Sequence, residues 1–372
     1  MFLTMQLLLK YLGWITLKQY VPGKVRDKGI LIGRLPVGKK NCITDVEGVK
    51  VGHVTLDHPL DDGDGEYVCT GVTAILPHGE NLFKHKVVGA SYVLNGFGKT
   101  TGLVQVNELG LIESPIMLTN TFAVPAATQG TLQYMLEENP EIGETTGTIN
   151  LVVGECNDSR LNSIRALPIQ PSHAVAAIKE ASTEAALEGA IGAGKGMICF
   201  GYKGGIGSSS RIIKDEGGGN TYTVGCMVLS NFGRKEDFQH SKYSIPKNKD
   251  VPSYPKTADG SIILVLATDA PLSSRQLQRV AKRCGIGLGR TGSHFSHGSG
   301  DIVIAFSTAH KIAHFTKESM EVRHQLREDH PVMNDLFESA ADVAEEAILN
   351  SLSQAVTTKG RKGNLVHAYP FG

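Results

Sequence analysis

Three small polar clusters border apolar runs in this sequence, and together they contain the groups that a nucleophilic enzyme needs. They are Asp259-Gly260-Ser261 before the run SIILVLATDA, Asn231 at the end of YTVGCMVLSN, and Ser299 with Asp301 at the start of DIVIAFST. Each cluster taken singly has the composition of an ordinary turn or strand end. Their combination with a long polar segment before Ser261 favours a catalytic role over that of ordinary turns.

A serine that begins a buried strand directly after a glycine can react with its own peptide bond. The Ser261 hydroxyl would attack the Gly260 carbonyl, where glycine tolerates strain, and water would resolve the resulting ester. Ser261 would then be a new N-terminus, whose α-amino group has an ordinary pKa of about 7.7 to 8.0. That amine can act as the base for its own hydroxyl, which solves the lack of an obvious histidine base. An amide such as Asn231 would donate to the oxyanion.

Other catalytic motifs fit the sequence poorly. The stretch 189–195 has the spacing of a phosphate-binding loop, but it lacks the Ser or Thr that binds magnesium. His294 with His297 and His310 with His314 have spacings seen in metal sites, yet neither pair has the Glu of H-E-x-x-H or a cysteine pair. Neither serine lies in a G-x-S-x-G elbow. We therefore expect no metal and no other cofactor.

The elements that must position these clusters indicate a large layered protein. A chain of 372 residues with 41% hydrophobic residues can form either two domains or one large layered domain. Several strand-like runs are apolar throughout, which is typical of strands covered on both faces. These runs lie at 71–76, 148–155, 196–202, 222–231, 261–270 and 301–308.

Helical patterns lie between and after these runs. Ser273 and Gln276 predict a capping box, with an apolar stripe behind it and Gly285 at the end of the helix. A second helix is expected over 172–190, and a third is indicated by an apolar stripe near the C-terminus that begins at Leu336. The polar segment 233–260 contains three prolines and is predicted to be an exposed loop, a kind of segment that tends to be functional or disordered.

Composition also limits partners and location. The formal net charge is +0, so no one-signed field would draw the chain to nucleic acid or to an anionic membrane. The six cysteines form no C-x-x-C pair and lie mostly in apolar runs, which favours buried thiols over disulfides. The N-terminus is apolar but interrupted by Lys10, and it lacks the basic start and cleavage site of a signal peptide. We expect a cytoplasmic protein, with a weak organelle address left open.

Around the three polar clusters that contain Asn231, Ser261 and Ser299, the chain resembles the autoprocessed L-aminopeptidase/D-amino-acid esterases and β-peptidyl aminopeptidases. Matching motifs occur in family order and cover about residues 27 to 310. They include ITDVEGVKVGH at 43–53, LNGFGK at 94–99, VVGECNDSRLN at 152–162, GYKGGIGSSSR, VLSNFG, DGSIILVLATDAPL and SHGSGDIVIAFST.

The resemblance implies an α/β fold, a four-layer αββα sandwich that two autoproteolytic fragments form as a single domain. After an N-terminal extension over 1–26, an α-chain part would cover 27–260 and a β-chain part 261–372. Segment 233–260 would be the exposed loop before the cleavage site between Gly260 and Ser261. Relatives are homo-oligomers of such αβ heterodimers.

The resemblance also implies roles for the residues that match the family motifs. Ser261 corresponds to the nucleophile, and Ser299 to a hydrogen-bonding relay. Asp301 would orient that relay, where some relatives carry Glu. Asn231 corresponds to an oxyanion donor.

Two further positions concern the substrate. Glu155 corresponds to the carboxylate that receives the free ammonium group of the substrate, which would make the enzyme act from the N-terminus. Asn157 stands where relatives commonly have an oxyanion-binding Tyr, so substrate size and the preference for L, D or β residues stay open. The implied partners are small peptides and amino-acid amides or esters, hydrolysed through an acyl-enzyme on Ser261.

Two alternatives to this metal-independent aminopeptidase remain. One is a self-processing acyltransferase like the ornithine acetyltransferases, although these use Thr as the new N-terminal residue. The other is a non-catalytic homologue that keeps the fold and is never processed.

Overall fold

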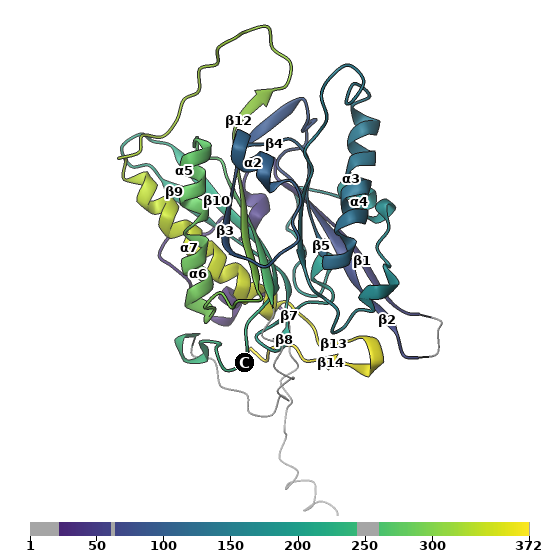
Figure 1. Ribbon diagram of the computed structural model, residues 1–372. Coiled ribbons are helices and arrows are strands. Elements are labelled where there is room, and N and C mark those ends of the chain that lie inside the picture. Colours follow the sequence, from purple (N-terminus) through teal and green to yellow (C-terminus); the bar gives the residue numbers. More distant parts are fainter. Residues whose placement is uncertain (1–21, 61–63, 244–259, 372) are drawn as a thin grey trace, which may run out of the picture.

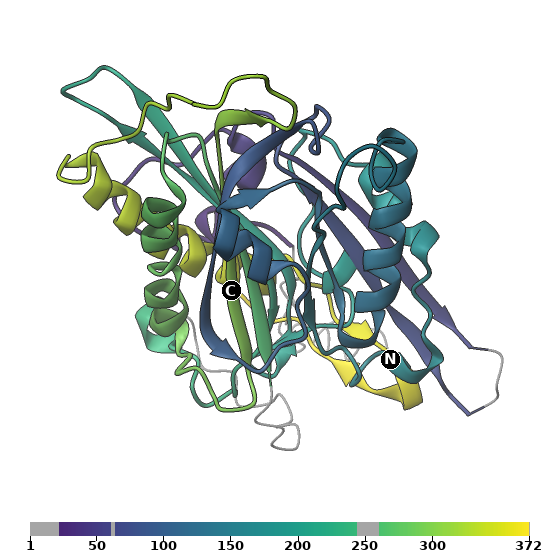
Figure 2. The same cartoon turned by 45° about the horizontal axis from the view of Figure 1, so that its top comes forward.

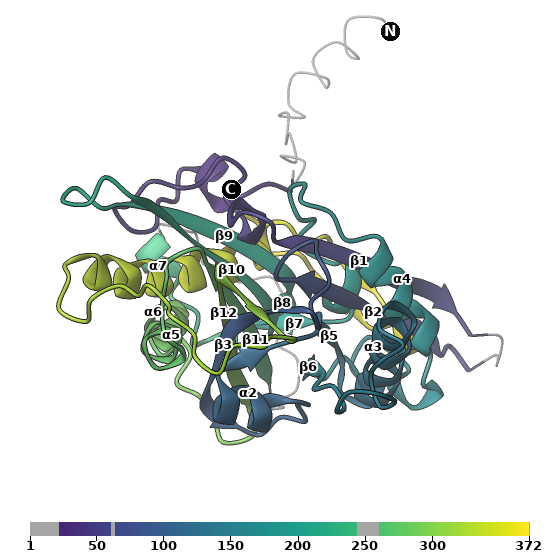
Figure 3. The same ribbon diagram turned by 90° about the horizontal axis from the view of Figure 1, so that it is seen from above.

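Two β-sheets lie face to face between two layers of helices in the computed structural model, which describes residues 22–60, 64–243 and 260–371 (Figure 1). One sheet has four strands in the order β1-β2-β5-β6, and the other has six in the order β4-β3-β12-β11-β10-β9. Two further views show the same helix, sheet, sheet, helix order (Figures 2 and 3). The predicted αββα sandwich is confirmed.

The four-stranded sheet comprises β1 (Lys50–Pro59), β2 (Tyr67–Leu76), β5 (Ile116–Asn120) and β6 (Val152–Cys156). Its outer face is covered by α3 (Val124–Glu138) and α4 (Pro171–Lys179). β5 and β6 are parallel to each other and are buried along their whole lengths. This sheet therefore has an apolar layer on each side, one toward the helices and one toward the other sheet.

The six-stranded sheet comprises β3 (His85–Gly96), β4 (Leu111–Ile112), β9 (Gly205–Lys214), β10 (Thr221–Asn231), β11 (Ser261–Thr268) and β12 (Gly300–Ala313). Its outer face is covered by α5 (Ser274–Ala281), α6 (Cys284–Thr291) and α7 (Val332–Ser353), and α2 (Leu103–Leu109) packs beside β3 and β4. β11 is antiparallel to β10 and parallel to β12.

Strand β11 shows why the predicted strands are apolar without alternation. Ile262 and Leu264 lie in the core between the sheet and its helices. Ile263 and Val265 lie in the core between the two sheets. Because both faces are covered, successive residues of one strand are buried whichever way they point.

Short elements complete the chain. The strand pairs are β7 (Ile198–Cys199) with β8 (Tyr202–Lys203), and β13 (Thr358–Lys359) with β14 (Leu365–Val366). The 3-10 helices are Val25–Lys28, Ile43–Asp45, Thr121–Ala123, Ile164–Ala166, Gly192–Gly194, His240–Tyr243 and Arg361–Gly363.

The predicted helices are all present, but some of them end at other residues than predicted. Ser273 caps α5 as expected, since its Oγ accepts from the Gln276 N–H and its own N–H donates to Gln276 Oε1. Gly285 lies inside α6 and does not end α5. The helix expected over 172–190 ends at Lys179, because the Ser182 backbone pairs with Val51 of β1.

One predicted strand, 196–202, is a two-stranded hairpin instead. Phe200 and Gly201 both have positive φ, at 50° and 74°, and connect β7 to β8. Two residues with positive φ form the turn that suits the twist of a tight hairpin. The apolar residues of this run therefore belong to a buried turn.

The segment 233–260, expected to be exposed, is partly buried. Residues 244–259 lie outside the described residues, but Phe238 and Tyr243 are buried in the core beside the helices. The Phe238 ring lies 4.9 Å from that of Phe200 and 5.4 Å from that of Tyr369, between centroids. Burial of these side chains overrides the polar composition locally, so the exposed-loop prediction is wrong at Phe238, His240 and Tyr243, whereas most other residues of 233–243 are exposed.

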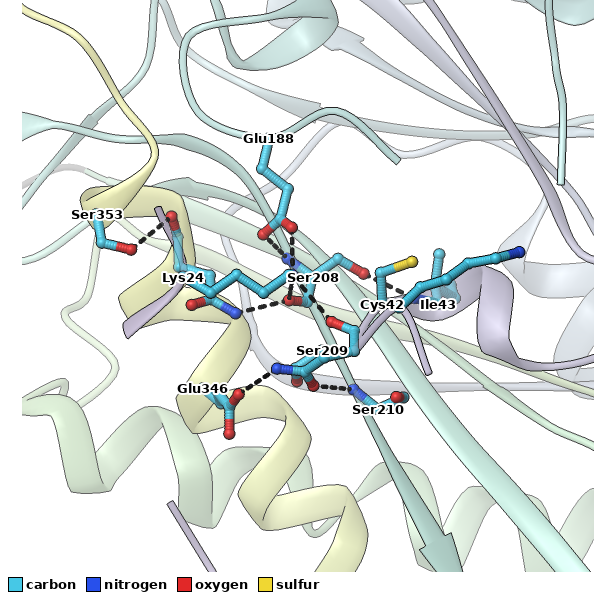
Figure 4. A network of polar contacts seen from close by, with 12 residues as sticks. Lys24, Cys42, Ile43, Glu188, Ser208, Ser209, Ser210, Glu346 and Ser353 are labelled. Carbon is cyan, nitrogen blue, oxygen red and sulfur yellow. Dashed lines mark hydrogen bonds and ion pairs between the residues drawn. The ribbon is translucent and has the colours of Figure 1, made fainter. Parts of the chain in front are cut away.

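The proposed N-terminal extension is also shorter than 1–26. Residues 1–21 lie outside the described residues, whereas Lys24 forms an ion pair with Glu188 and also donates to the Ser208 carbonyl (Figure 4). Val25 is fully buried, and its N–H donates to Asn350 of α7. Residues 24–26 therefore belong to the packed domain.

All six cysteines are buried and free, as expected. In the part of the chain that the structure describes, no helix combines the length and the apolar character needed to cross a membrane.

Candidate active site

Ser261 begins β11 between Asn231 of β10 and Gly300 of β12. Its Oγ donates to the Gly260 carbonyl oxygen at 2.6 Å and accepts from the Gly300 N–H at 3.3 Å. Ser261 as a whole is buried. The structure thus places the predicted nucleophile against the peptide bond that the sequence predicts to be cut.

Gly260 lies so close to the end of β10 that no side chain fits. A Cβ at this position would lie 2.6 Å from Phe232 Cα and 2.7 Å from the Asn231 carbonyl oxygen. Both are backbone atoms, so they cannot move aside as a flexible side chain would. The glycine permits this close approach to β10, in which its carbonyl oxygen accepts from the Ser261 hydroxyl.

The Asn231 side chain is fixed at both ends of its amide. Oδ1 accepts from the Ile198 N–H and Nδ2 donates to the Asn157 carbonyl, both at 2.9 Å. These partners define which end of the amide is the donor. One Nδ2 hydrogen is used by the bond to Asn157, and the role of this amide as an oxyanion donor stays a prediction.

Ser299 and Asp301 form a buried pair. The Ser299 Oγ donates to Asp301 Oδ1 at 2.7 Å. Burial raises the pKa of the Asp301 carboxyl to about 6, and the hydrogen bond from Ser299 opposes that rise. Within the described residues no hydrogen bond joins the Ser299 and Ser261 hydroxyls, so the relay role of Ser299 stays a prediction.

Glu155 reaches the site from the other sheet. It is buried at the end of β6, where Oε1 accepts from the Lys99 N–H at 2.9 Å and Oε2 accepts from the Thr121 hydroxyl. A Cβ on Gly98 would lie 3.8 Å from Glu155 Oε1 and 3.7 Å from Gly300 Cα. The carboxylate is therefore close to the same strand end as Ser261, across the gap between the sheets.

Asn157 contributes a backbone contact. Its side chain is exposed, and Oδ1 accepts from the Ser159 N–H at 2.9 Å in a local turn. Its carbonyl accepts from Asn231 Nδ2. The structure thus gives Asn157 a part in orienting the Asn231 amide, and the predicted donor role of its side chain stays untested.

Sequence reasoning assigned no role to several polar residues beside the site. Lys99 and Thr121 hold the Glu155 carboxylate, and Asn95 binds the turn before Ser299. Asn95 and Lys99 lie in LNGFGK, a motif that carried the family resemblance without any role for its side chains. The motif spans the end of β3, a strand that was not predicted from the sequence, so no local pattern pointed to these side chains.

A second buried cluster, around Lys203, stabilises the backbone that binds the Asn231 amide. The Lys203 ammonium donates to the carbonyls of Gly194, Met197 and Gly204 at 2.7 to 2.9 Å, and burial lowers its pKa to about 7. Burial likewise raises the pKa of nearby Asp158 to about 7. Because Met197 precedes Ile198, the residue that donates to Asn231, Lys203 stabilises the loop that orients the amide.

Within the described residues, no hydrogen bond joins a side chain of either histidine pair to Ser261, Ser299 or Asp301. His294 and His297 are in the loop before β12, as expected. His310 Nε2 lies 2.8 Å from the His324 carbonyl oxygen, and the His314 ring packs on Phe83. Among the described residues, no group of three or more His, Cys, Asp or Glu side chains is arranged to hold a metal ion.

Comparison with known proteins identifies the family to which this chain is related. A family model described as Peptidase family S58 matches residues 41–366. The beta-peptidyl aminopeptidase BapA of Sphingosinicella microcystinivorans is 36% identical over 366 residues, covering 93% of this chain and 89% of that protein.

Solved structures agree with the family match. The crystal structure of the PH0078 protein from Pyrococcus horikoshii OT3 is 49% identical, has a TM-score of 0.85, and is matched over 94% of this chain and 96% of its own. The L-aminopeptidase D-Ala-esterase/amidase of Ochrobactrum anthropi, a prototype of the serine aminopeptidases with a variant Ntn hydrolase fold, is 31% identical with a TM-score of 0.83 over the same shares. Because the family model spans most of the sequence and the fold matches along nearly all of it, the chain belongs to peptidase family S58.

Proposed function

We propose that this protein is a metal-independent serine aminopeptidase that cleaves itself between Gly260 and Ser261 and then uses Ser261 as its nucleophile. The observation that carries the proposal is the buried Ser261 hydroxyl, 2.6 Å from the oxygen of the preceding carbonyl. Membership of a peptidase family and similarity to aminopeptidases support the reaction class.

Self-cleavage starts when Ser261 Oγ attacks the carbonyl carbon of Gly260. The Oγ–C bond forms, the bond to the Ser261 nitrogen breaks, and the proton from the hydroxyl ends on that nitrogen. Water then hydrolyses the ester, which frees the hydroxyl and leaves a carboxylate on Gly260. The new α-amino group of Ser261 lies on the same residue as the hydroxyl and can accept its proton in later cycles.

In turnover, the substrate is held by its amino end. Glu155 is a buried carboxylate near the strand end, and such a group favours a substrate ammonium over an acylated amine. Ser261 attacks the first carbonyl of the substrate, and the spare Nδ2 hydrogen of Asn231 donates to the oxyanion. The leaving amine departs, and water releases the amino acid from the acyl-enzyme.

The substrate class follows from this recognition. The printed activities of the relatives, beta-peptidyl aminopeptidase and L-aminopeptidase with D-Ala-esterase/amidase, support small peptides and amino-acid amides or esters as substrates. We also propose a cytoplasmic homo-oligomer of αβ heterodimers without nucleic-acid or membrane partners. Ser261 in place of Thr, together with the peptidase family, favours hydrolysis over acyl transfer.

The test compares an amino-acid amide with its N-acetylated form. We expect hydrolysis of the free amine only, and Glu155→Gln should raise KM for it at least about 10-fold, the effect of losing roughly 1.4 kcal/mol of binding. Equal hydrolysis of both compounds would show that the enzyme does not recognise the free amino end.

A further inference from the structure

The turn at 296–300 that precedes β12 is fastened by one side chain from β3. Asn95 Nδ2 donates to the carbonyls of Ser296 and His297 at 3.1 Å each, and also to the carbonyl of Ser299. The turn is further closed by the Ser299 N–H, which donates to the Ser296 carbonyl at 2.9 Å. Three carbonyls of a single turn therefore converge on the amide of Asn95.

The peptide unit between Ser299 and Gly300 connects this anchor to the cleavage site. Its carbonyl accepts from Asn95 Nδ2 and from the Phe97 N–H at 3.3 Å. Its N–H, on Gly300, lies 3.3 Å from both the Gly260 carbonyl oxygen and Ser261 Oγ. A trans peptide is planar with its C=O and N–H pointing in opposite directions, so donors to the carbonyl fix the direction of the N–H.

Packing prevents this peptide unit from rotating. A Cβ at Gly300 would lie 2.8 Å from the Phe97 carbonyl oxygen and 3.0 Å from Gly98 Cα, so the end of β12 presses directly on the end of β3. Hydrogen bonds to the carbonyl also polarise the N–H of the same peptide, because bonds in a chain strengthen one another.

We infer that the Gly300 N–H is the oxyanion donor for self-cleavage and that Asn95 is the positioning residue that aims it. This inference rests on the proposed function. As Ser261 Oγ bonds to the Gly260 carbon, the carbonyl electron pair moves onto the oxygen, and the Gly300 N–H donates to that growing negative charge. The charge disappears when the C–N bond breaks and the ester forms. A preorganised donor of this kind ordinarily changes a rate by about 10²- to 10³-fold.

The experiment follows self-cleavage of newly translated full-length chains by denaturing gel. Asn95→Asp is nearly isosteric but cannot donate, and it should slow the appearance of the two fragments by about 10- to 100-fold, the effect of a misplaced catalytic group. Asn95→Ala should also be slow. The matched control is Asn364→Asp, since Asn364 Nδ2 also donates to a backbone carbonyl, that of Arg160 at 2.9 Å, at an exposed site away from β11.

Hydroxylamine shows which step is slow, and the melting temperature separates positioning from a general loss of structure. It cleaves an ester that has already formed, so it should not restore the rate of Asn95→Asp, whose slow step precedes the ester. The melting temperature of Asn95→Asp should stay close to that of uncleaved Ser261→Ala.

Two results would overturn the inference. One is cleavage of Asn95→Asp at the wild-type rate, and the other is a slow variant that hydroxylamine rescues. If the wild type itself fails to cleave, the proposed function fails instead, so the two failures are distinguishable.

Discussion

At the residue scale, Asp301 has an unfavourable location for a carboxylate. Burial raises its pKa to about 6, against an ordinary value of 3.8. Between these two values the folded protein binds more protons than the unfolded chain, so this group lowers the free energy of unfolding as the pH rises. The ionised form is the better acceptor for the Ser299 hydroxyl. Asp301 thus reduces stability at neutral pH while supporting the proposed relay.

The pH dependence of turnover should reflect this carboxyl. Protonation of the Ser261 α-amine already lowers kcat below its pKa, and we predict that kcat of the wild type falls more steeply below about pH 6, because the protonated Asp301 acid no longer orients Ser299. Asp301→Asn should lower kcat by about 100-fold, the effect of a misplaced catalytic group, and remove this steeper part of the acid limb. The same variant should be more stable above pH 6 by urea denaturation. An unchanged acid limb in Asp301→Asn would assign it to another group.

Gly260 should be required for its small size. Gly260→Ala would place a Cβ against the backbone of Asn231 and Phe232, so the scissile carbonyl would move away from Ser261. We predict that this variant remains largely uncleaved when the wild type is fully processed, as measured by intact mass. Gly147→Ala is the control, because a Cβ there meets no atom within 4 Å. Full processing of Gly260→Ala would show that the close approach is not needed.

At the element scale, the sequence predicted the strands that carry the nucleophile and its neighbours. β10, β11 and β12 are apolar because both faces are covered, and Asn231 and Ser261 stand at their ends as expected. β9 was not predicted as a strand, because SSSR reads as polar although Ser208 and Arg211 are fully buried. Their partners lie far away in the chain, so no local pattern reveals that burial.

The buried ion pair between β9 and α7 illustrates such a long-range partner. Glu346 of α7 binds Arg211 of β9 at 2.6 Å and Arg26 of the N-terminal segment at 2.9 Å, and Figure 4 shows Glu346 beside the serines of β9. Arg211 and Glu346 are fully buried, and burial lowers the pKa of Arg211 while Glu346 opposes that shift. The contact joins three segments that are distant in sequence.

Removing one partner of this pair should be costly. Glu346→Ala leaves the buried Arg211 guanidinium without its carboxylate, and we predict a loss of about 3 to 5 kcal/mol in the free energy of unfolding. Glu338→Ala is the matched control on the same helix, because its partner Arg34 is 68% exposed and solvent screens such a pair, so its loss should change stability far less. Urea denaturation of uncleaved Ser261→Ala, with and without each change, measures both. A similar small loss in the two variants would contradict the assigned role.

At the scale of the whole molecule, the site joins both sheets. The proposed nucleophile Ser261, together with Asn231 and Asp301, comes from the six-stranded sheet, and Glu155 comes from the four-stranded sheet. The sequence and its family resemblance predicted roles for these residues, whereas only the folded chain shows that the Gly300 N–H donates to Ser261 Oγ and that the Asn157 carbonyl accepts from Asn231. Residue types do not predict contacts of this kind, because the groups involved belong to the backbone.

The sheet order also predicts how the two fragments behave. If the chain is cut as proposed, β11 and β12 of the smaller fragment would still lie between β10 and β3 of the larger one. Separation would expose two strands buried on both faces, so we predict a single species in native size-exclusion chromatography and two chains in denaturant. Two separate native peaks would contradict this arrangement.

The most direct test of the account is the intact mass of the purified protein under denaturing conditions. We predict two chains for the wild type, residues 1–260 and residues 261–372 with Ser261 as the free N-terminus, and one chain of 372 residues for Ser261→Ala. A wild-type protein that hydrolyses amino-acid amides while remaining one uncut chain would contradict it.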